Sequence, residues 1–161
     1  MTPIPVHALF ETHLTVANLE ASVTFYRDVI GLELAYQLDE PRVAFFWIGA
    51  RGRSMLGVWE MGHAPNLMRL HTAFGCTLED VLAAPPRLQA AGIAPRGFHG
   101  EPVDEPVVIG WMPAAALFFT DPDGHLLEYL AMLTEAPRPD LGVVTYSLWT
   151  AGTAARRSDE S

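Results

Sequence analysis

Cysteines, basic residues and long hydrophobic runs are all scarce in this sequence, and each shortage excludes a class of protein. The single cysteine, Cys76, excludes an internal disulfide and a four-cysteine zinc site. Ten Lys+Arg against nineteen Asp+Glu give a net charge of −9, which disfavours binding to phosphate backbones. No stretch approaches the roughly 18 consecutive apolar residues of a membrane helix, and residues 1–10 lack the pattern of a signal peptide. We therefore expect a soluble, cytoplasmic protein with neither nucleic acid nor membrane as a partner.

The chain has 161 residues, half of them hydrophobic, which is enough for one well-packed domain. In its first half, alternating β-formers predict a strand over 10–16, with Glu11, His13 and Thr15 on one face. Asn18 can cap a following helix, and Gly31 is suited to end it. Further strands are predicted over 32–38, 43–48 and 54–60.

The second half repeats this order. A strand over 69–76 precedes Thr77, which can cap a helix that ends at Gly92. Pro85-Pro86 is expected to kink or split that helix, because proline removes a hydrogen-bond donor and clashes with the preceding turn. The strands predicted after it cover 95–98, 107–110, 115–120 and 125–133. Residues 143–150 could add an edge strand or a dimer contact, and residues 151–161 are expected to be frayed.

Each half therefore begins with a strand and a helix and continues with at least three further strands, the second half having one extra short strand. One such unit has a helix on one face of its sheet and leaves the other face bare, so two units can close the bare faces around a cleft. We predict an α+β fold in which two βαβββ modules form a curved mixed sheet around a central cleft. The predicted boundaries, within one domain overall, are an N-terminal extension (1–8), two modules (9–62 and 68–133) and a C-terminal tail (134–161).

Side chains that can bind metals lie on the strands predicted to line this cleft. They are Glu11 and His13 on the first strand, His71 at the start of the second half, and Glu128 on the last strand. Glu128 stands between apolar residues, and a buried carboxylate is costly unless it is paired, protonated or bound to a cation. Imidazole and carboxylate groups suit divalent Zn, Ni, Co, Mn or Fe, and the set does not select one of them. The competing interpretation is that the histidines are structural.

Three segments resemble signatures of the vicinal oxygen chelate superfamily, which includes glyoxalases, bleomycin-resistance proteins and extradiol dioxygenases. Residues 18–32 (NLEASVTFYRDVIGL) resemble its first helix, residues 119–128 (FTDPDGHLLE) its final hairpin, and residues 71–76 (HTAFGC) the opening strand of its second module. The resemblance covers roughly residues 9–133. It implies a homodimer, a small-molecule substrate and one divalent metal ion per site.

The resemblance implies that His71 and Glu128 are metal ligands. The usual place of the first ligand falls on Glu11, which lies five residues before Val16 just as His71 lies five residues before Cys76. His13 is on the same face one pleat further along, so both remain candidates. A one-residue shift in register would turn either side chain to the opposite face.

The activity implied is that of a metal-dependent lyase or isomerase, with the member of the Glu11/His13 pair that does not bind the metal as a general base. The place of the fourth glyoxalase ligand falls on Gly57 or Leu56, neither of which binds through its side chain. A non-catalytic drug-binding protein similar to bleomycin-resistance proteins is an alternative. An extradiol dioxygenase is a second alternative, which a Glu11 ligand disfavours.

Other chemistry-bearing residues have simpler interpretations. Trp47, Trp59 and Trp111 are interpreted mainly as packing residues, although they could line a pocket. His125 points away from Glu128 by strand alternation and is predicted to be structural or on the surface. Asp121 and Asp123 are predicted turn formers.

Overall fold

A computed structural model describes residues 8–63 and 68–159, which form two compact units. One unit contains the described residues up to Leu70 together with Asp121–His125, and the other contains His71–Thr120 and the residues from Leu126 onward. The predicted extension over 1–8 lies outside the described residues except for Ala8.

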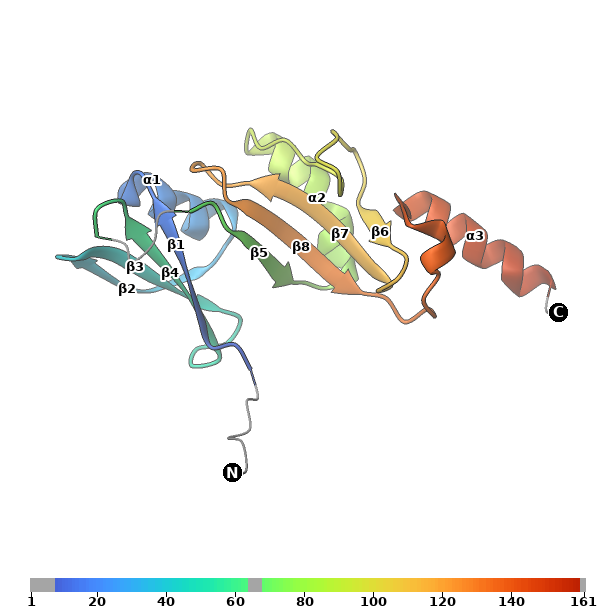
Figure 1. The fold of residues 1–161 in the computed structure, drawn as a ribbon, viewed down its shortest axis with the longest axis horizontal. Helices are drawn as coiled ribbons and strands as arrows, with labels where there is room; N and C mark the ends of the chain where they lie inside the picture. Colours follow the sequence, from blue (N-terminus) through green and yellow to red (C-terminus); the bar gives the residue numbers. More distant parts are fainter. Residues whose placement is uncertain (1–7, 64–67, 160–161) are drawn as a thin grey trace, which may run out of the picture. The chain divides into compact units, whose positions relative to one another are not determined.

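The first unit is a four-stranded mixed sheet with a helix (Figure 1). Its elements are β1 (Glu11–Val16), α1 (Leu19–Thr24), a π-helical turn (Phe25–Val29), β2 (Glu33–Asp39), β3 (Arg42–Ile48) and β4 (Ser54–Glu60). The strand order is β1-β4-β3-β2, and β1 runs parallel to β4. As predicted, the Asn18 side chain caps α1 by accepting from the Ala21 N–H, and Gly31 follows the helical segment with a φ of 80°.

The second unit has the same arrangement with one added edge strand. Its elements are β5 (His71–Gly75), α2 (Leu78–Ala90), β6 (Val107–Ile109), β7 (Ala114–Thr120), β8 (Leu126–Met132), a 3₁₀ turn (Pro139–Leu141), β9 (Val143–Thr145) and α3 (Tyr146–Asp159). The strand order is β5-β8-β7-β6-β9, and β5 runs parallel to β8 as β1 does to β4. The predicted α+β class with two βαβββ-like modules is thus confirmed, each module having its own mixed sheet.

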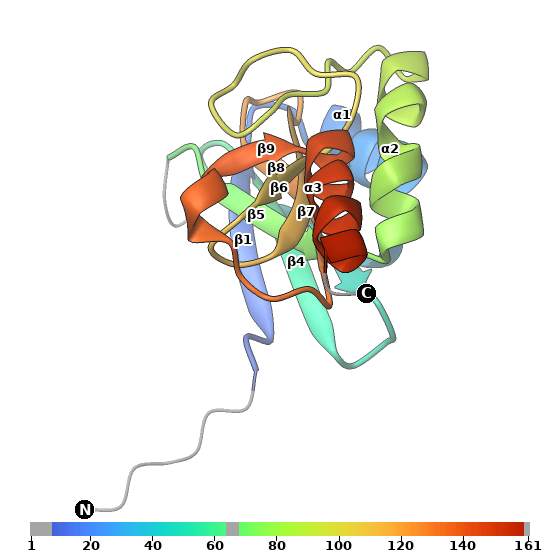
Figure 2. The same cartoon turned by 90° about the vertical axis from the view of Figure 1, so that its right-hand side faces the viewer.

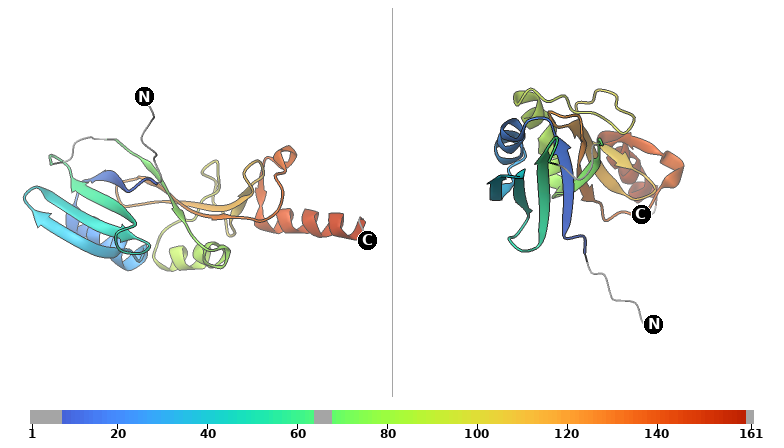
Figure 3. Two further views of the ribbon diagram at one scale, coloured as in Figure 1. Left: turned by 90° about the horizontal axis from the view of Figure 1, so that it is seen from below. Right: turned by 60° about the vertical axis from the view of Figure 1, so that its left-hand side comes forward.

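Helix α2 lies on one side of the strands of this sheet, as the left view of Figure 3 shows. It packs against β7 and β8 through Val81, Ala84 and Leu88, all of which are buried. Of the kink or split predicted at Pro85-Pro86, the split does not occur, because α2 is continuous from Leu78 to Ala90, and the kink stays a prediction. Two prolines remove two main-chain donors, but Pro85 is itself buried on the packed face, and tertiary packing stabilises helices more than propensity does.

The outer edge of the second sheet differs from the prediction in two places. The strand expected over 95–98 is reduced to a single bridging residue, Arg96, which pairs with Phe118 of β7. The chain then leaves the sheet and returns as β6, because the intervening segment contains prolines and glycines that cannot continue a ladder.

The edge strand considered over 143–150 is confirmed for Val143–Thr145, which form β9 and pair antiparallel with β6 (Figure 2). Residues 146–150 belong instead to α3. The frayed end predicted for 151–161 is wrong over 151–159, since α3 continues to Asp159, and residues 160–161 lie outside the described residues. Glu105 caps the start of this helix by accepting from the Ser147 N–H at 3.0 Å and from the Ser147 hydroxyl at 2.7 Å. Trp149 is fully buried and anchors the helix.

The turn between β7 and β8 is a fixed part of the first unit. Asp121 accepts a hydrogen bond of 2.8 Å from the Tyr26 hydroxyl, and Asp123 accepts one of 2.8 Å from the Ala17 N–H. His125 is 1% exposed, with Nε2 at 2.6 Å from the Thr15 carbonyl oxygen. The structural prediction for His125 is confirmed, and the two aspartates hold the turn to β1 and α1 as well as forming it.

In the described ranges, no helix combines the length and the apolar character needed to cross a membrane.

Candidate functional site

His71 and Glu128 form a side-chain pair on the two parallel strands β5 and β8. Glu128 is the register partner of Ala73, two residues after His71, so strand alternation places both side chains on one face of the sheet. His71 Nε2 lies 3.0 Å from Glu128 Oε2. Two of the residues predicted from the sequence are therefore adjacent, although they are 57 positions apart in the chain.

The Glu128 carboxyl group is buried and only half satisfied. The residue is 5% exposed, and Oε1 has no hydrogen-bond partner. Burial raises the pKa of this carboxyl above its ordinary value, while the hydrogen bond with His71 acts in the opposite direction. Its neighbour across the ladder is Phe118 of β7, whose ring centroid lies 6.1 Å from that of His71. A carboxylate oxygen without a partner in such apolar surroundings is costly unless a proton or a cation satisfies it.

These two donors have the chemistry of a divalent-metal site. A neutral imidazole nitrogen and a carboxylate are ligands for Zn and related ions, and a metal ion can take the place of the proton that the two groups share. It would also satisfy the second carboxylate oxygen. No cluster of three or more His, Cys, Asp and Glu side chains able to hold a metal occurs in residues 8–63 and 68–159. The structure thus joins His71 to Glu128 in one unit, and the other two predicted residues lie together in the other unit.

Glu11 and His13 share one face of β1, as predicted. The burial of the strand alternates, with Leu14 and Val16 in the core and Glu11 and His13 partly exposed. His13 Nε2 lies 3.6 Å from Glu11 Oε1, which is close enough for electrostatic interaction but long for a hydrogen bond.

A hydrogen bond from Trp59 fixes the proton of the His13 ring. The Trp59 indole N–H can only donate, and it lies 2.7 Å from His13 Nδ1. Nδ1 is therefore the acceptor, and the neutral ring carries its proton on Nε2, the nitrogen that faces Glu11. Sequence reasoning interpreted Trp59 as a packing residue and missed this contact. The signal lies in the register, because Trp59 pairs with Thr15, two residues beyond His13 and therefore on the same face.

Gly57 on β4 leaves the room that the His13 ring occupies. It is the register partner of His13, and a Cβ atom at this position would lie 2.7 Å from His13 Cε1. Leu56, the other residue considered for a fourth ligand, is fully buried on the opposite face.

Known proteins resemble this chain over most of its length. The family model of the Glyoxalase/Bleomycin resistance protein/Dioxygenase superfamily matches residues 6–129. A lactoylglutathione lyase of Neisseria meningitidis serogroup A is 29% identical over 129 residues, covering 76% of this chain and 88% of the relative.

Solved structures agree with this assignment. An integron cassette protein from the mobile metagenome of the Halifax Harbour sewage outfall has a TM-score of 0.66 and 30% identity, covering 79% of this chain and all of that one. A lactoylglutathione lyase from Agrobacterium tumefaciens has a TM-score of 0.62 and 26% identity, covering 80% and 96% of the two chains. Sequence signatures, module topology and these matches lead to one conclusion: the chain belongs to the glyoxalase/bleomycin resistance protein/dioxygenase superfamily.

Proposed function

We propose that this protein is a metal-dependent enzyme of lyase or isomerase type that acts on a small substrate with two neighbouring oxygens. The observation that carries the proposal is the buried Glu128 carboxyl group, with one oxygen hydrogen-bonded to His71 and the other without a partner. Relatives named lactoylglutathione lyase support a reaction of this class. In the proposal, His71 and Glu128 are the ligands in the second unit, and Glu11 is the further ligand predicted from the sequence.

The choice of Glu11 over His13 rests on the tautomer of the histidine. His13 accepts the Trp59 N–H at Nδ1, so Nε2 carries a proton and has no lone pair for a metal ion. Glu11 has carboxylate oxygens available on the same face of β1. A carboxylate in this place agrees with the spacing of the repeat in the sequence.

When bound, the metal would supply Lewis acidity to two substrate oxygens, lowering the energy of negative charge that develops on them. His13 would donate a hydrogen bond or a proton from Nε2 to one of these oxygens. This differs from the general-base role considered from the sequence, because a nitrogen that already carries a proton cannot accept one. Trp59 is then a positioning residue that holds the ring in its donating tautomer, and Phe118 keeps water from the buried side of Glu128.

Metal analysis tests the proposal directly. Protein purified without chelators and dialysed against Zn²⁺ or Ni²⁺ is expected to retain about one ion per chain, the stoichiometry of a single site. H71A and E128Q should abolish retention, and E11Q should weaken it. H99A is the matched control, since His99 is an exposed loop residue and its loss should leave the metal content unchanged. Retention of the ion by H71A, or weaker binding in H13Q than in E11Q, would overturn the assignment of ligands.

A second candidate is a protein that sequesters an apolar compound without catalysis. It is favoured by the rings of Phe98 and Phe118, 5.9 Å apart beside the Glu128 carboxyl group. Calorimetry with and without EDTA distinguishes the two functions, because sequestration by an apolar surface does not depend on the metal.

We also propose that the protein forms a homodimer, as its resemblance to the superfamily suggests. Light scattering coupled to gel filtration tests this, and a monomeric mass across the micromolar range would contradict it.

A further inference from the structure

We infer that Phe98 is a specificity-determining residue that selects substrates carrying a planar aromatic group next to their chelating oxygens. The inference deepens the proposed function and rests on it, since it assigns a substrate class to the same site. It concerns the loop after Arg96, which lies entirely within the second unit.

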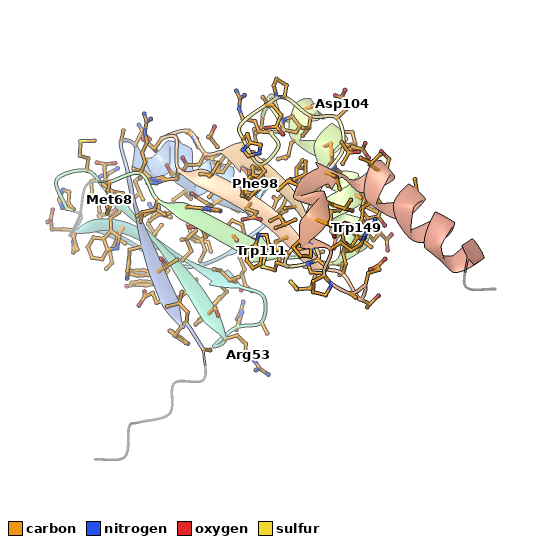
Figure 4. The ribbon with its side chains drawn as sticks, turned by 45° about the vertical axis from the view of Figure 1, so that its right-hand side comes forward. Arg53, Met68, Phe98, Asp104, Trp111 and Trp149 are labelled. Atoms are coloured by element: carbon orange, nitrogen blue, oxygen red, sulfur yellow. The ribbon has the colours of Figure 1, made fainter. Side chains whose placement is uncertain are left out.

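A continuous row of rings leads from this loop to the proposed ligands. Phe98 meets Phe118 edge to face, with ring centroids 5.9 Å apart and an interplanar angle of 84°. Phe118 in turn meets His71 at 6.1 Å and 63°, and is the cross-strand partner of Glu128. Phe118 is 5% exposed whereas Phe98 is 45% exposed, so of the two phenylalanines only Phe98 has surface left for a ligand. Figure 4 labels Phe98 on this unit.

The loop holds Phe98 in place without help from a ligand. Arg96 makes both main-chain hydrogen bonds with Phe118, at 2.8 and 3.0 Å, which fixes the chain two residues before Phe98. The Gly97 N–H bonds the Glu101 carbonyl at 2.8 Å, and the Glu101 carboxylate accepts the His99 N–H at 2.9 Å. A ring fixed before binding loses little conformational entropy when a ligand stacks on it.

The charge around Phe98 disfavours an anionic group on the substrate. Arg96 is the only Lys or Arg between Arg87 and Arg138. Its Nη1 already donates to the Gly100 carbonyl at 2.9 Å. The rest of the loop carries acidic side chains, Glu101, Asp104 and Glu105. Of these, Glu101 is held next to Phe98 by the His99 N–H, so a neutral ring is favoured at this place over a carboxylate or phosphonate.

Two hydroxamic acids test this inference, because both bind metals through two neighbouring oxygens and only one carries a ring. The probes are benzohydroxamic acid and acetohydroxamic acid, titrated into Co²⁺-loaded protein and followed by the cobalt absorption spectrum and by calorimetry. We expect wild-type protein to bind the aromatic probe more tightly. F98A should reduce that preference roughly three- to tenfold, the range of one aromatic contact, without changing the affinity for acetohydroxamic acid.

Two control variants show whether the preference for the aromatic probe depends on the ring of Phe98 itself. F98Y keeps the ring and should keep the preference. W111A removes an aromatic side chain that is 63% exposed on the β6–β7 turn, and it should also leave the preference unchanged. If Co²⁺ binds and F98A shows the wild-type preference, the inference is wrong and the metal site stands. If Co²⁺ does not bind, or neither probe changes its spectrum, the proposed function fails and the inference fails with it.

Discussion

Replacing Glu128 by glutamine should make the protein more stable than wild type without metal and less stable than wild type with metal. In the apo protein Glu128 is 5% exposed, and its Oε1 has no hydrogen-bond partner. An unsatisfied buried acceptor costs about 1–3 kcal/mol, and more when it is charged. Glutamine keeps the shape and a hydrogen-bonding group for His71 but carries no charge. We expect apo E128Q to be more stable than apo wild type by about 1 kcal/mol at pH 8, which is roughly 2–4 °C in Tm.

The pH dependence has a definite sign. Burial raises the pKa of Glu128 in the folded state above its ordinary value. Between the two pKa values the folded protein binds more protons than the unfolded chain, so its stability falls as the pH rises through the folded pKa. Below the ordinary glutamate pKa, Glu128 is protonated in both the folded and the unfolded protein, so it causes no loss of stability there. E128Q lacks this group, so its advantage over wild type should be present at pH 8 and vanish in acid.

Metal reverses the order because it binds only the folded site. At a free-ion concentration one hundred times Kd, binding stabilises wild type by about 2.7 kcal/mol. E128Q should gain little, so wild type becomes the more stable protein in Zn²⁺. Thermal unfolding by circular dichroism, in EDTA and in Zn²⁺ at several pH values, measures both effects. An E128Q protein that is less stable than wild type in EDTA at pH 8, or that gains as much as wild type from Zn²⁺, would refute this reasoning.

Two further substitutions test the contacts of the first unit. W59F removes the donor to His13 Nδ1, so ¹⁵N NMR of the ring should change from the single Nε2–H tautomer to a mixture, and an unchanged ring spectrum would contradict the assigned tautomer. Y26F leaves the buried Asp121 carboxylate without its hydroxyl partner, and should lower the free energy of unfolding in urea by about 1.5–3 kcal/mol, as for hydrogen bonds to charged groups. Burial, and then the neighbouring Asp121, raise the pKa of Tyr26, so its hydroxyl stays a donor at all working pH values. An equal loss for Y26F on a D121N background would mean that the pair is not coupled.

Local signals in the sequence determined most of the secondary structure. Asn18 and Thr77 cap the two helices as predicted, because capping depends on a side chain and main-chain groups two or three residues away. Alternation also placed Glu11 and His13 on one face of β1 correctly, since the period of a strand is local. The continuity of α2 through its prolines and the helix at the C-terminus were not predicted, because packing and a distant cap from Glu105 decide them.

The candidate site was likewise predictable from the sequence only in part. The sequence by itself determined which residues can bind a metal and on which strands they lie, because residue type and strand period are properties of short segments. Only the tertiary structure decided that His71 meets Glu128, that the Trp59 N–H fixes the tautomer of His13, and that Phe98 extends the row of rings. Each of these contacts joins residues at least 20 positions apart, so it depends on strand register and on loop paths, which are set by packing across the whole unit.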